Sequence, residues 1–283
     1  MILLHNGLLY GSTERATALA VEGNRIIAVG RDADVLNLSR PGTQQIDLEG
    51  AFVLPGLTDS HLHLDLYGQS LLMVDCSAPT KAECLEQVYQ RSLEVTNGSW
   101  IMGHGWNQNR WSSGFGNAHE LDQFTPRNPV FLTDMSLHSV WVNTKAMELA
   151  GITAATPDPA GGIIQRDEQG EPTGILFEAA VNLVKSIIPP PTAEERRQNL
   201  LKAQEKLLGY GVTSVHDFDR APCFAALQQM DADGSLVLRV LKSLPVEQLD
   251  EAIALGIGSG FGNRHLRIGS VKMFSDGALG PQT

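Results

Sequence analysis

Strand-like and helix-like segments alternate regularly after the helix-breaking proline run at 189–191. Thr192 and Glu195 have the spacing of a capping box, which predicts a helix that ends near Gly209. The following segments are expected as strand 212–216, helix 221–230, strand 236–241, a helix from 245 to about 255, and strand 266–274. Because such alternation gives parallel βαβ units with the helices outside, we predict an α/β fold, either a (β/α)8 barrel or an open doubly wound sheet.

A second feature is the pair His61 and His63, which follows an apolar, strand-like run that begins at Phe52. Side chains two residues apart on a strand point to the same face, so both imidazoles can bind one metal ion. Neutral imidazole is a good ligand for zinc and similar divalent metals. Such a pair also arises by chance, and the alternative is one solvated and one hydrogen-bonded histidine.

Polar residues also end the later predicted strands, where barrel enzymes place their active sites. The strand 212–216 leads to His216 and Asp217, and the next strand leads less distinctively to Lys242. We expect His216 to be structural rather than catalytic. We therefore predict a reactive site at this edge of the sheet mainly from the residues that end the first and last strands.

Lys272 lies inside the apolar segment 266–274. Burial of a charged lysine is costly and favours the neutral amine. A neutral amine can react with carbon dioxide to form a carbamate, which binds a metal as a carboxylate does. The alternative is a lysine paired with Asp276 or another carboxylate, and the residues by themselves favour that alternative.

The residues before this region predict two further parts. In the first fifty residues, Asn6-Gly7 indicates one hairpin, and the segments 18–21 and 26–29 indicate another. Between about 70 and 190 the pattern is less regular: Thr80 caps a helix that buries four apolar residues, and 151–174 is expected to be turns and loop. The four residues expected on the buried face of that helix are Cys84, Leu85, Val88 and Leu93.

Composition limits the choice of partners. The net charge of −11 argues against nucleic acid or an anionic membrane as the main partner. The three cysteines form no CxxC pair, which favours a reducing compartment. Without a signal-peptide pattern or a bilayer-length apolar run, we expect a soluble, cytoplasmic protein.

The chain resembles the amidohydrolase superfamily, which comprises metal-dependent hydrolases on a distorted (β/α)8 barrel. The resemblance rests on segment 53–63, which contains the two histidines, and on segment 271–274, which is similar to the fourth-strand lysine segment of hydantoinase-like members. The branch that it most resembles contains N-substituted formamide deformylase and its uncharacterised relatives. Supporting segments are 103–106, 138–143, 170–178 and 274–280.

The resemblance implies a division of the chain. Residues 1–52 would form the N-terminal part of a β-sandwich, 53–69 and 192–283 the first four strands of the barrel, and 70–191 a substrate-capping insertion after the first strand. Family members continue with strands that provide two more histidines and the aspartate that acts as general base. We therefore expect a chain truncated after the fourth barrel strand, with no general base of its own and little activity alone.

The resemblance also implies roles for residues. His61 and His63 would bind the more buried metal, and a carboxylated Lys272 would bridge two metals or complete a one-metal site. The expected cofactor is one or two divalent ions, with zinc preferred, and Glu178 is a second candidate carboxylate. The expected substrate-binding residues are Trp106, His138 and Asp276. For the tryptophan, a place in the ordinary core of the insertion is the alternative.

The function expected from these residues is hydrolysis of carbon–nitrogen bonds in amide, imide, N-acyl or N-formyl compounds by metal-activated water. The partner would be a small amide-type molecule, and self-association of the chain stays open. One alternative is a catalytically inactive ligand-binding or regulatory relative with the same fold. A further alternative is a binding protein without metal, in which the two histidines are incidental.

Overall fold

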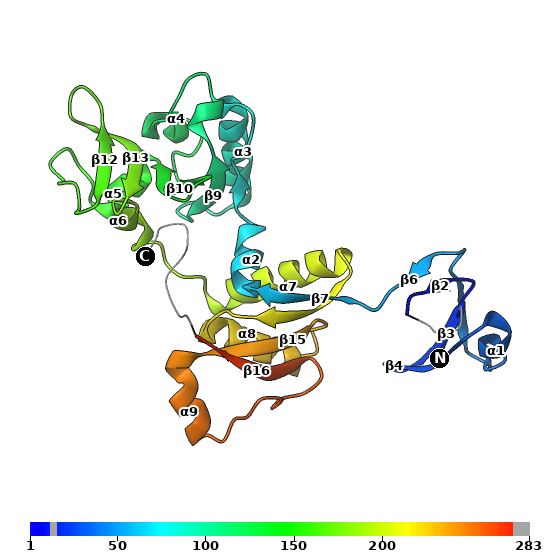
Figure 1. Ribbon diagram of the computed structural model, residues 1–283. Helices are drawn as coiled ribbons and strands as arrows, with labels where there is room; N and C mark the ends of the chain where they lie inside the picture. Colours follow the sequence, from blue (N-terminus) through cyan, green and yellow to red (C-terminus); the bar gives the residue numbers. More distant parts are fainter. Residues whose placement is uncertain (12–15, 274–283) are drawn as a thin grey trace.

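Sheets of four, six and four strands, with a two-stranded sheet beside the first, organise the chain. The computed structural model describes residues 1–11 and 16–273, so the predicted substrate-binding residue Asp276 lies outside the described residues. Figure 1 shows the N-terminal sheet, the six-stranded sheet and the last four-stranded sheet as three bodies, and the blue strand β7 belongs to the last of them.

The N-terminal sheet is formed, in spatial order, by β4 (Arg25–Gly30), β3 (Ala18–Glu22), β1 (Ile2–His5) and β5 (Gln44–Asp47). The helix α1 (Asp32–Leu36) packs on it through Val35, which is buried with Leu3 and Ala18. A small parallel sheet pairs β2 (Leu8–Leu9) with β6 (Phe52–Val53). This part of the chain therefore has its own small apolar core.

One of the two predicted hairpins is confirmed and the other is wrong. β3 and β4 pair antiparallel through the turn at Gly23, as expected. At Asn6-Gly7, by contrast, the chain passes from one sheet to another, because β1 pairs with β3 and β5 whereas β2 pairs with β6. Asn6 does adopt a left-handed φ of 56°, and its side chain donates to Asp47 at 2.8 Å. The predicted turn conformation at Asn6 is therefore present. Which strands pair beside it depends on tertiary contacts.

The six-stranded sheet is formed, in spatial order, by β12 (Gly162–Arg166), β13 (Pro172–Glu178), β11 (Ser139–Val142), β10 (Val130–Asp134), β9 (Ile101–Trp106) and β8 (Val74–Asp75). Its helices are α3 (Lys81–Glu94), the 3-10 turn η1 (Gln108–Arg110), α4 (Ala118–Asp122), α5 (Thr144–Ala150) and α6 (Val181–Lys185). The sheet is mixed, because β8, β9 and β10 are parallel and the remaining pairs are antiparallel.

Two sequence predictions for this sheet need correction. The region 151–174, expected to be turns and loop, contains β12 and the start of β13, which pair antiparallel. The many Gly, Pro and Asp residues of this region indicated turns, and its only run of large apolar residues, Ile163-Ile164, is too short to predict a strand. In α3, Thr80 accepts from the backbone N–H of Glu83 as predicted, but Leu93 is 64% exposed instead of buried.

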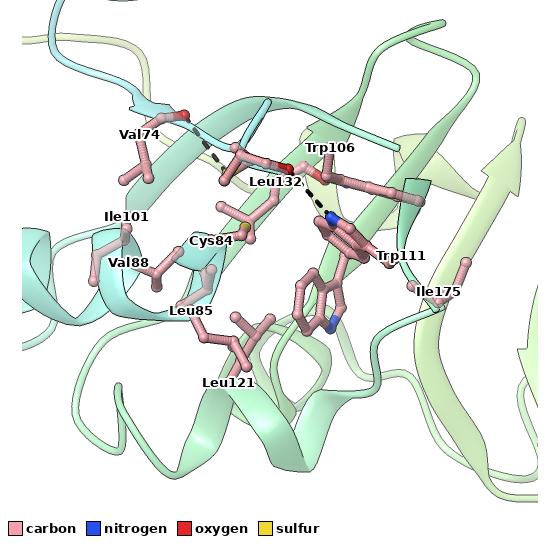
Figure 2. Close-up of a cluster of buried hydrophobic side chains, with 14 residues drawn as sticks. Val74, Cys84, Leu85, Val88, Ile101, Trp106, Trp111, Leu121, Leu132 and Ile175 are labelled. Atoms are coloured by element: carbon pink, nitrogen blue, oxygen red, sulfur yellow. Dashed lines mark hydrogen bonds between the residues drawn. The ribbon is translucent and has the colours of Figure 1, made fainter. Parts of the chain in front are cut away.

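The core of the six-stranded sheet is aromatic. Trp106 is fully buried, stacks on Trp111 at 6.2 Å between ring centroids, and donates its indole N–H to the carbonyl of Leu132 at 2.8 Å. Figure 2 shows these rings packed against aliphatic side chains from α3 and the strands. Large buried rings with paired N–H groups supply much of the stability of such a core.

The third sheet is parallel throughout and has the spatial order β7 (Leu57–Leu62), β14 (Val212–Asp217), β15 (Arg239–Pro245) and β16 (Leu266–Lys272). Its helices are α2 (Leu64–Ser70), α7 (Ala193–Gly209), α8 (Ala221–Ala232), the 3-10 turn η2 (Val246–Gln248) and α9 (Leu249–Ala254). The predicted alternation of strands and helices is confirmed, although β15 begins three residues later than expected. The α/β fold with mixed sheets is therefore established.

Local signals explain why this part folds as predicted. Thr192 and Glu195 form the reciprocal capping box at the start of α7. The buried face of α7 includes Leu200 and Leu207, which pack in one cluster with Val215 of β14. Because the four strands are parallel, their carboxyl ends meet at one edge of the sheet, next to the start of α2 and α8.

Within residues 1–11 and 16–273, the helices are all too short or too polar to cross a bilayer. The thiols of Cys76, Cys84 and Cys223 are free and buried. Figure 1 shows α7 and α8 against the parallel sheet, with the six-stranded sheet on the far side of α2.

Candidate metal centre

The two predicted histidine ligands stand at the carboxyl end of the first parallel strand. His61 is near the end of β7, and His63 is the residue that precedes α2. Their ring centroids are 6.0 Å apart. With zinc–nitrogen bonds of about 2.0–2.1 Å, two imidazoles on one ion have centroids roughly 5 to 6 Å apart. The spacing of the pair therefore fits one shared metal ion.

Lys272 joins the pair across the ring of Phe218. The phenyl ring follows β14 and lies 4.4 Å from the His61 ring and 6.4 Å from the His63 ring, between centroids. The Lys272 ammonium is 5.1 Å from the same centroid. The structure thus places all three predicted ligands, which come from the carboxyl ends of β7 and β16, around one half-buried ring. Their binding of a metal stays a prediction.

The carboxylate of Asp219 contacts His63 directly. Its Oδ1 lies 3.2 Å from Nδ1 of His63, and its Oδ2 accepts from the backbone N–H of Asp65 at 2.6 Å. The side chain of Asp219 is 7% exposed. Burial raises the pKa of the Asp219 carboxyl, and the nearby Asp217 charge raises that pKa further.

A buried ion pair lies beneath this contact. Lys242 donates to Oδ2 of Asp217 at 2.7 Å and also to the backbone carbonyl of Asp219. The other oxygen of Asp217 accepts from the backbone N–H of Leu64 at 2.9 Å. A charge pair with almost no exposed surface persists only when its remaining hydrogen-bonding groups are also paired.

A cavity of about 410 Å³ opens beside these groups. Its lining includes His63, Asp219 and Lys272, together with residues from α2, α7 and the start of α8. Asp65 and Arg196, which also line it, form an ion pair at 3.1 Å with both side chains about 10% exposed. A concave site with converging polar groups is the usual form of a small-molecule site.

Asp217, Asp219 and Cys223 also come close enough to be considered as a metal cluster, since one ligand atom of each lies within 4.8 Å of the others. Their chemistry argues against it. Asp217 is already neutralised by Lys242, and burial raises the pKa of the Cys223 thiol, which keeps it protonated. A raised thiol pKa makes metal binding by the sulfur less favourable, because the proton must first be released. The histidine pair is the better candidate.

The predicted substrate-facing role of Trp106 is wrong. The side chain is 0% exposed and lies within the core of the six-stranded sheet (Figure 2). The alternative interpretation, a tryptophan in the ordinary core of the insertion, is what the structure shows. A large aromatic residue at the end of a strand gives the same sequence signal in both cases, and only its packing distinguishes them.

His138 and Glu178 lie side by side at the six-stranded sheet. Nδ1 of His138 is 3.0 Å from Oε2 of Glu178, and both side chains are more than half exposed. The hydrogen bond to the Glu178 carboxylate raises the pKa of His138, and the charge of that carboxylate acts in the same direction. Neither residue belongs to the lining of the 410 Å³ cavity. Their predicted roles remain predictions.

Sequence reasoning missed three residues of this site. Asp219 and Phe218 follow β14 directly, and Lys242 was noted only as an indistinct strand end. A usable signal was present, since the segment 217–219 carries two carboxylates at the carboxyl end of a parallel strand. The sequence does not predict the contact between Asp219 and His63, because the two residues are 156 positions apart in the chain.

Imidazoles, a lysine and buried carboxylates meet at one edge of the parallel sheet, an arrangement that suits a metal-dependent hydrolase of the α/β class. Residues 44–283 match the model of the Amidohydrolase family, and the chain belongs to this family. The resemblance recognised from sequence is thereby confirmed, and membership implies a divalent metal.

The chain is similar to several members with known sequences or structures. It is 33% identical to Protein LONG AFTER FAR-RED 3 of Arabidopsis thaliana over 99% of this chain and 51% of that protein. It is 37% identical to the N-substituted formamide deformylase of Arthrobacter pascens over 71% of this chain and 39% of that enzyme.

Among solved structures, an uncharacterized metal-dependent hydrolase from Pyrococcus furiosus superposes with a TM-score of 0.77 at 32% identity. That match covers 99% of this chain and 57% of the other. The chain spans about half the length of the curated relatives that it matches over nearly its full extent.

Proposed function

We propose that the complete protein hydrolyses carbon–nitrogen bonds in amide, imide, N-acyl or N-formyl compounds. The observation that carries this proposal is the convergence of His61, His63 and Lys272 around Phe218 at the carboxyl ends of parallel strands. The similarity to an N-substituted formamide deformylase supports the choice of bond.

His61 and His63 would hold the metal, and zinc is the ion that we propose. Lys272, once carboxylated, would complete the donor set, and Glu178 is the second candidate for a carboxylate ligand. A bound divalent ion supplies a water of lowered pKa and polarises the carbonyl of the substrate. Phe218 places an apolar ring beside the donor groups, 4.4 Å from the His61 ring and 5.1 Å from the Lys272 ammonium.

We also propose the architecture that the family resemblance implies. β7, β14, β15 and β16 would be the first four strands of a (β/α)8 barrel, built from 53–69 and 192–283. Residues 1–52 would belong to a β-sandwich, and 70–191 would cap the substrate site. The regular parallel order of the four strands supports this proposal.

His138 is proposed to contact substrate from the capping insertion, where it lies beside the candidate ligand Glu178, and Asp276 is proposed to contact substrate as well. The backbone supports a special role for the first two residues. Glu178 and Leu137, the neighbour of His138, both have left-handed φ angles, of 51° and 66°. Such conformations are costly for residues other than glycine and cluster at binding sites. We propose a small-molecule substrate and a cytoplasmic location.

The test is His61→Ala in the complete protein, with His119→Ala as the matched control. The His119 side chain is 87% exposed on α4. The proposal expects His61→Ala to lose bound metal and turnover of N-acyl and N-formyl amines, while the control retains both. Metal content is measured by atomic emission and turnover by amine release. Full metal content together with an unchanged rate in His61→Ala would refute the proposal.

A further inference from the structure

The helix after His63 receives its N-terminal cap from another strand. The side chain of His63 makes no capping hydrogen bond, although this residue is the N-cap of α2. The first N–H groups of a helix have no partner within the helix. Here Leu64 N–H donates to Asp217 at 2.9 Å, and Asp65 N–H donates to Asp219 at 2.6 Å. The end of β14 thus caps α2, and the imidazole of His63 is left available.

The same Asp219 also contacts that imidazole. Its Oδ1 lies 3.2 Å from Nδ1 of His63. A carboxylate only accepts hydrogen bonds, so Nδ1 carries the hydrogen and Nε2 keeps its lone pair. The side chain of His63 is 43% exposed, whereas that of Asp219 is 7% exposed. The imidazole is therefore held by a hydrogen bond at Nδ1 on its buried side, and its other side remains accessible.

Asp219 is itself fixed in place. Lys242 donates to the backbone carbonyl of Asp219 and to the carboxylate of Asp217. The lysine side chain is 1% exposed and that of Asp217 is 0% exposed. Since each partner is buried and paired, movement of one would leave another charge unpaired, which is costly. Lys242 of β15 thus links this strand to the end of β14 through hydrogen bonds.

We propose that Asp219 is a positioning residue for His63: it selects the imidazole tautomer with hydrogen on Nδ1 and presents Nε2 as the ligand atom, while Lys242 and Asp217 hold Asp219 in place. Groups that bind the second nitrogen of a ligating histidine fix its tautomer and orientation in this way. The inference rests on the proposed function for the identity of the ligand, a metal ion. The tautomer itself is a property of the metal-free protein.

The first measurement needs no mutation of the network. Long-range ¹H–¹⁵N correlation spectra of the complete, metal-stripped protein, labelled at histidine nitrogens, report which nitrogen carries hydrogen. The His63 signals are assigned by their loss in His63→Gln. We expect neutral His63 with hydrogen on Nδ1. Hydrogen on Nε2 in the wild-type protein would overturn the proposal.

The second measurement compares Asp219→Asn with Asp233→Asn. Asp233 is a matched control, because it too accepts a backbone N–H, from Ser235 at 2.9 Å, but lies at the end of α8. We expect Asp219→Asn to shift the His63 tautomer toward Nε2–H and to weaken zinc binding about 10- to 100-fold, measured by chelator competition. The control should change neither.

These readouts separate the positioning role from the proposed function. A tautomer that depends on Asp219 in a protein that binds no zinc would support positioning and refute the metal centre. Tight zinc binding that is unchanged in folded Asp219→Asn, with an unchanged His63 tautomer, would refute positioning and leave the metal centre intact. If Asp219→Asn fails to fold, the wild-type tautomer still decides the proposal.

Discussion

Nζ of Lys242 lies 2.7 Å from Oδ2 of Asp217, and the two side chains are 1% and 0% exposed. The pair joins β15 to β14 below the candidate ligand His63. In the sequence, its members lie 25 positions apart. A buried pair of this kind is weak evidence for net stability, but loss of one partner leaves the other charge without compensation.

We expect Lys242→Met to lower the free energy of unfolding by about 3 to 5 kcal/mol, because Asp217 is then buried alone. Urea denaturation measures the loss. The control is Lys202→Met on the exposed face of α7, which should change stability little. Adding Asp217→Asn to Lys242→Met should recover part of the loss, and a double variant no more stable than Lys242→Met would contradict the explanation.

The capping box at α7 gives a second prediction. Thr192→Ala removes the hydroxyl that accepts from Glu195 N–H at 3.2 Å. The expected loss is about 0.5 to 2 kcal/mol in the free energy of unfolding. Glu195→Gln is the control, because glutamine also serves at this position of the box. Equal losses for the two variants would show that the hydroxyl is not the important group.

The burial of Trp106 predicts a stability effect without a binding effect. Trp106→Phe removes the hydrogen bond from the indole N–H to the Leu132 carbonyl, at a cost of about 0.5 to 1.5 kcal/mol. Trp141→Phe is a matched variant, since its indole also donates to a backbone carbonyl, that of Asn117, at 2.9 Å. Both substitutions should lower the melting temperature of the complete protein and leave its KM for the proposed N-acyl or N-formyl substrate unchanged. A large rise in KM at full stability for Trp106→Phe would restore the substrate-facing role.

The contact between His138 and Glu178 predicts a pH dependence. The Glu178 carboxylate raises the pKa of His138 in the folded protein. The contact therefore contributes to stability below the ordinary histidine pKa, and that contribution is lost as the pH rises through the higher folded-state pKa. NMR titration of the His138 ring should show the raised pKa, and Glu178→Gln should lower it. An identical midpoint in both proteins would exclude the carboxylate as its cause.

Several features followed from neighbouring residues alone. The alternation after residue 191 predicted the order of β14, α8, β15, α9 and β16, and the box of Thr192 and Glu195 predicted the start of α7. The spacing of His61 and His63 predicted two imidazoles close together, which the structure places 6.0 Å apart. Periodicity and capping depend on residues within a few positions of one another, so they are visible in a sequence.

Other features depended on packing between distant segments. Asn6-Gly7 has the chemistry of a hairpin, yet it joins two different sheets, and Trp106 is core although its place at a strand end also suits a binding site. Asp219 meets His63 only because β7 and β14 are neighbours in the parallel sheet. Turn and strand signals state what a segment can do locally. Which partner it meets is decided by the burial of apolar surface across the whole fold, and that is a property of the tertiary structure.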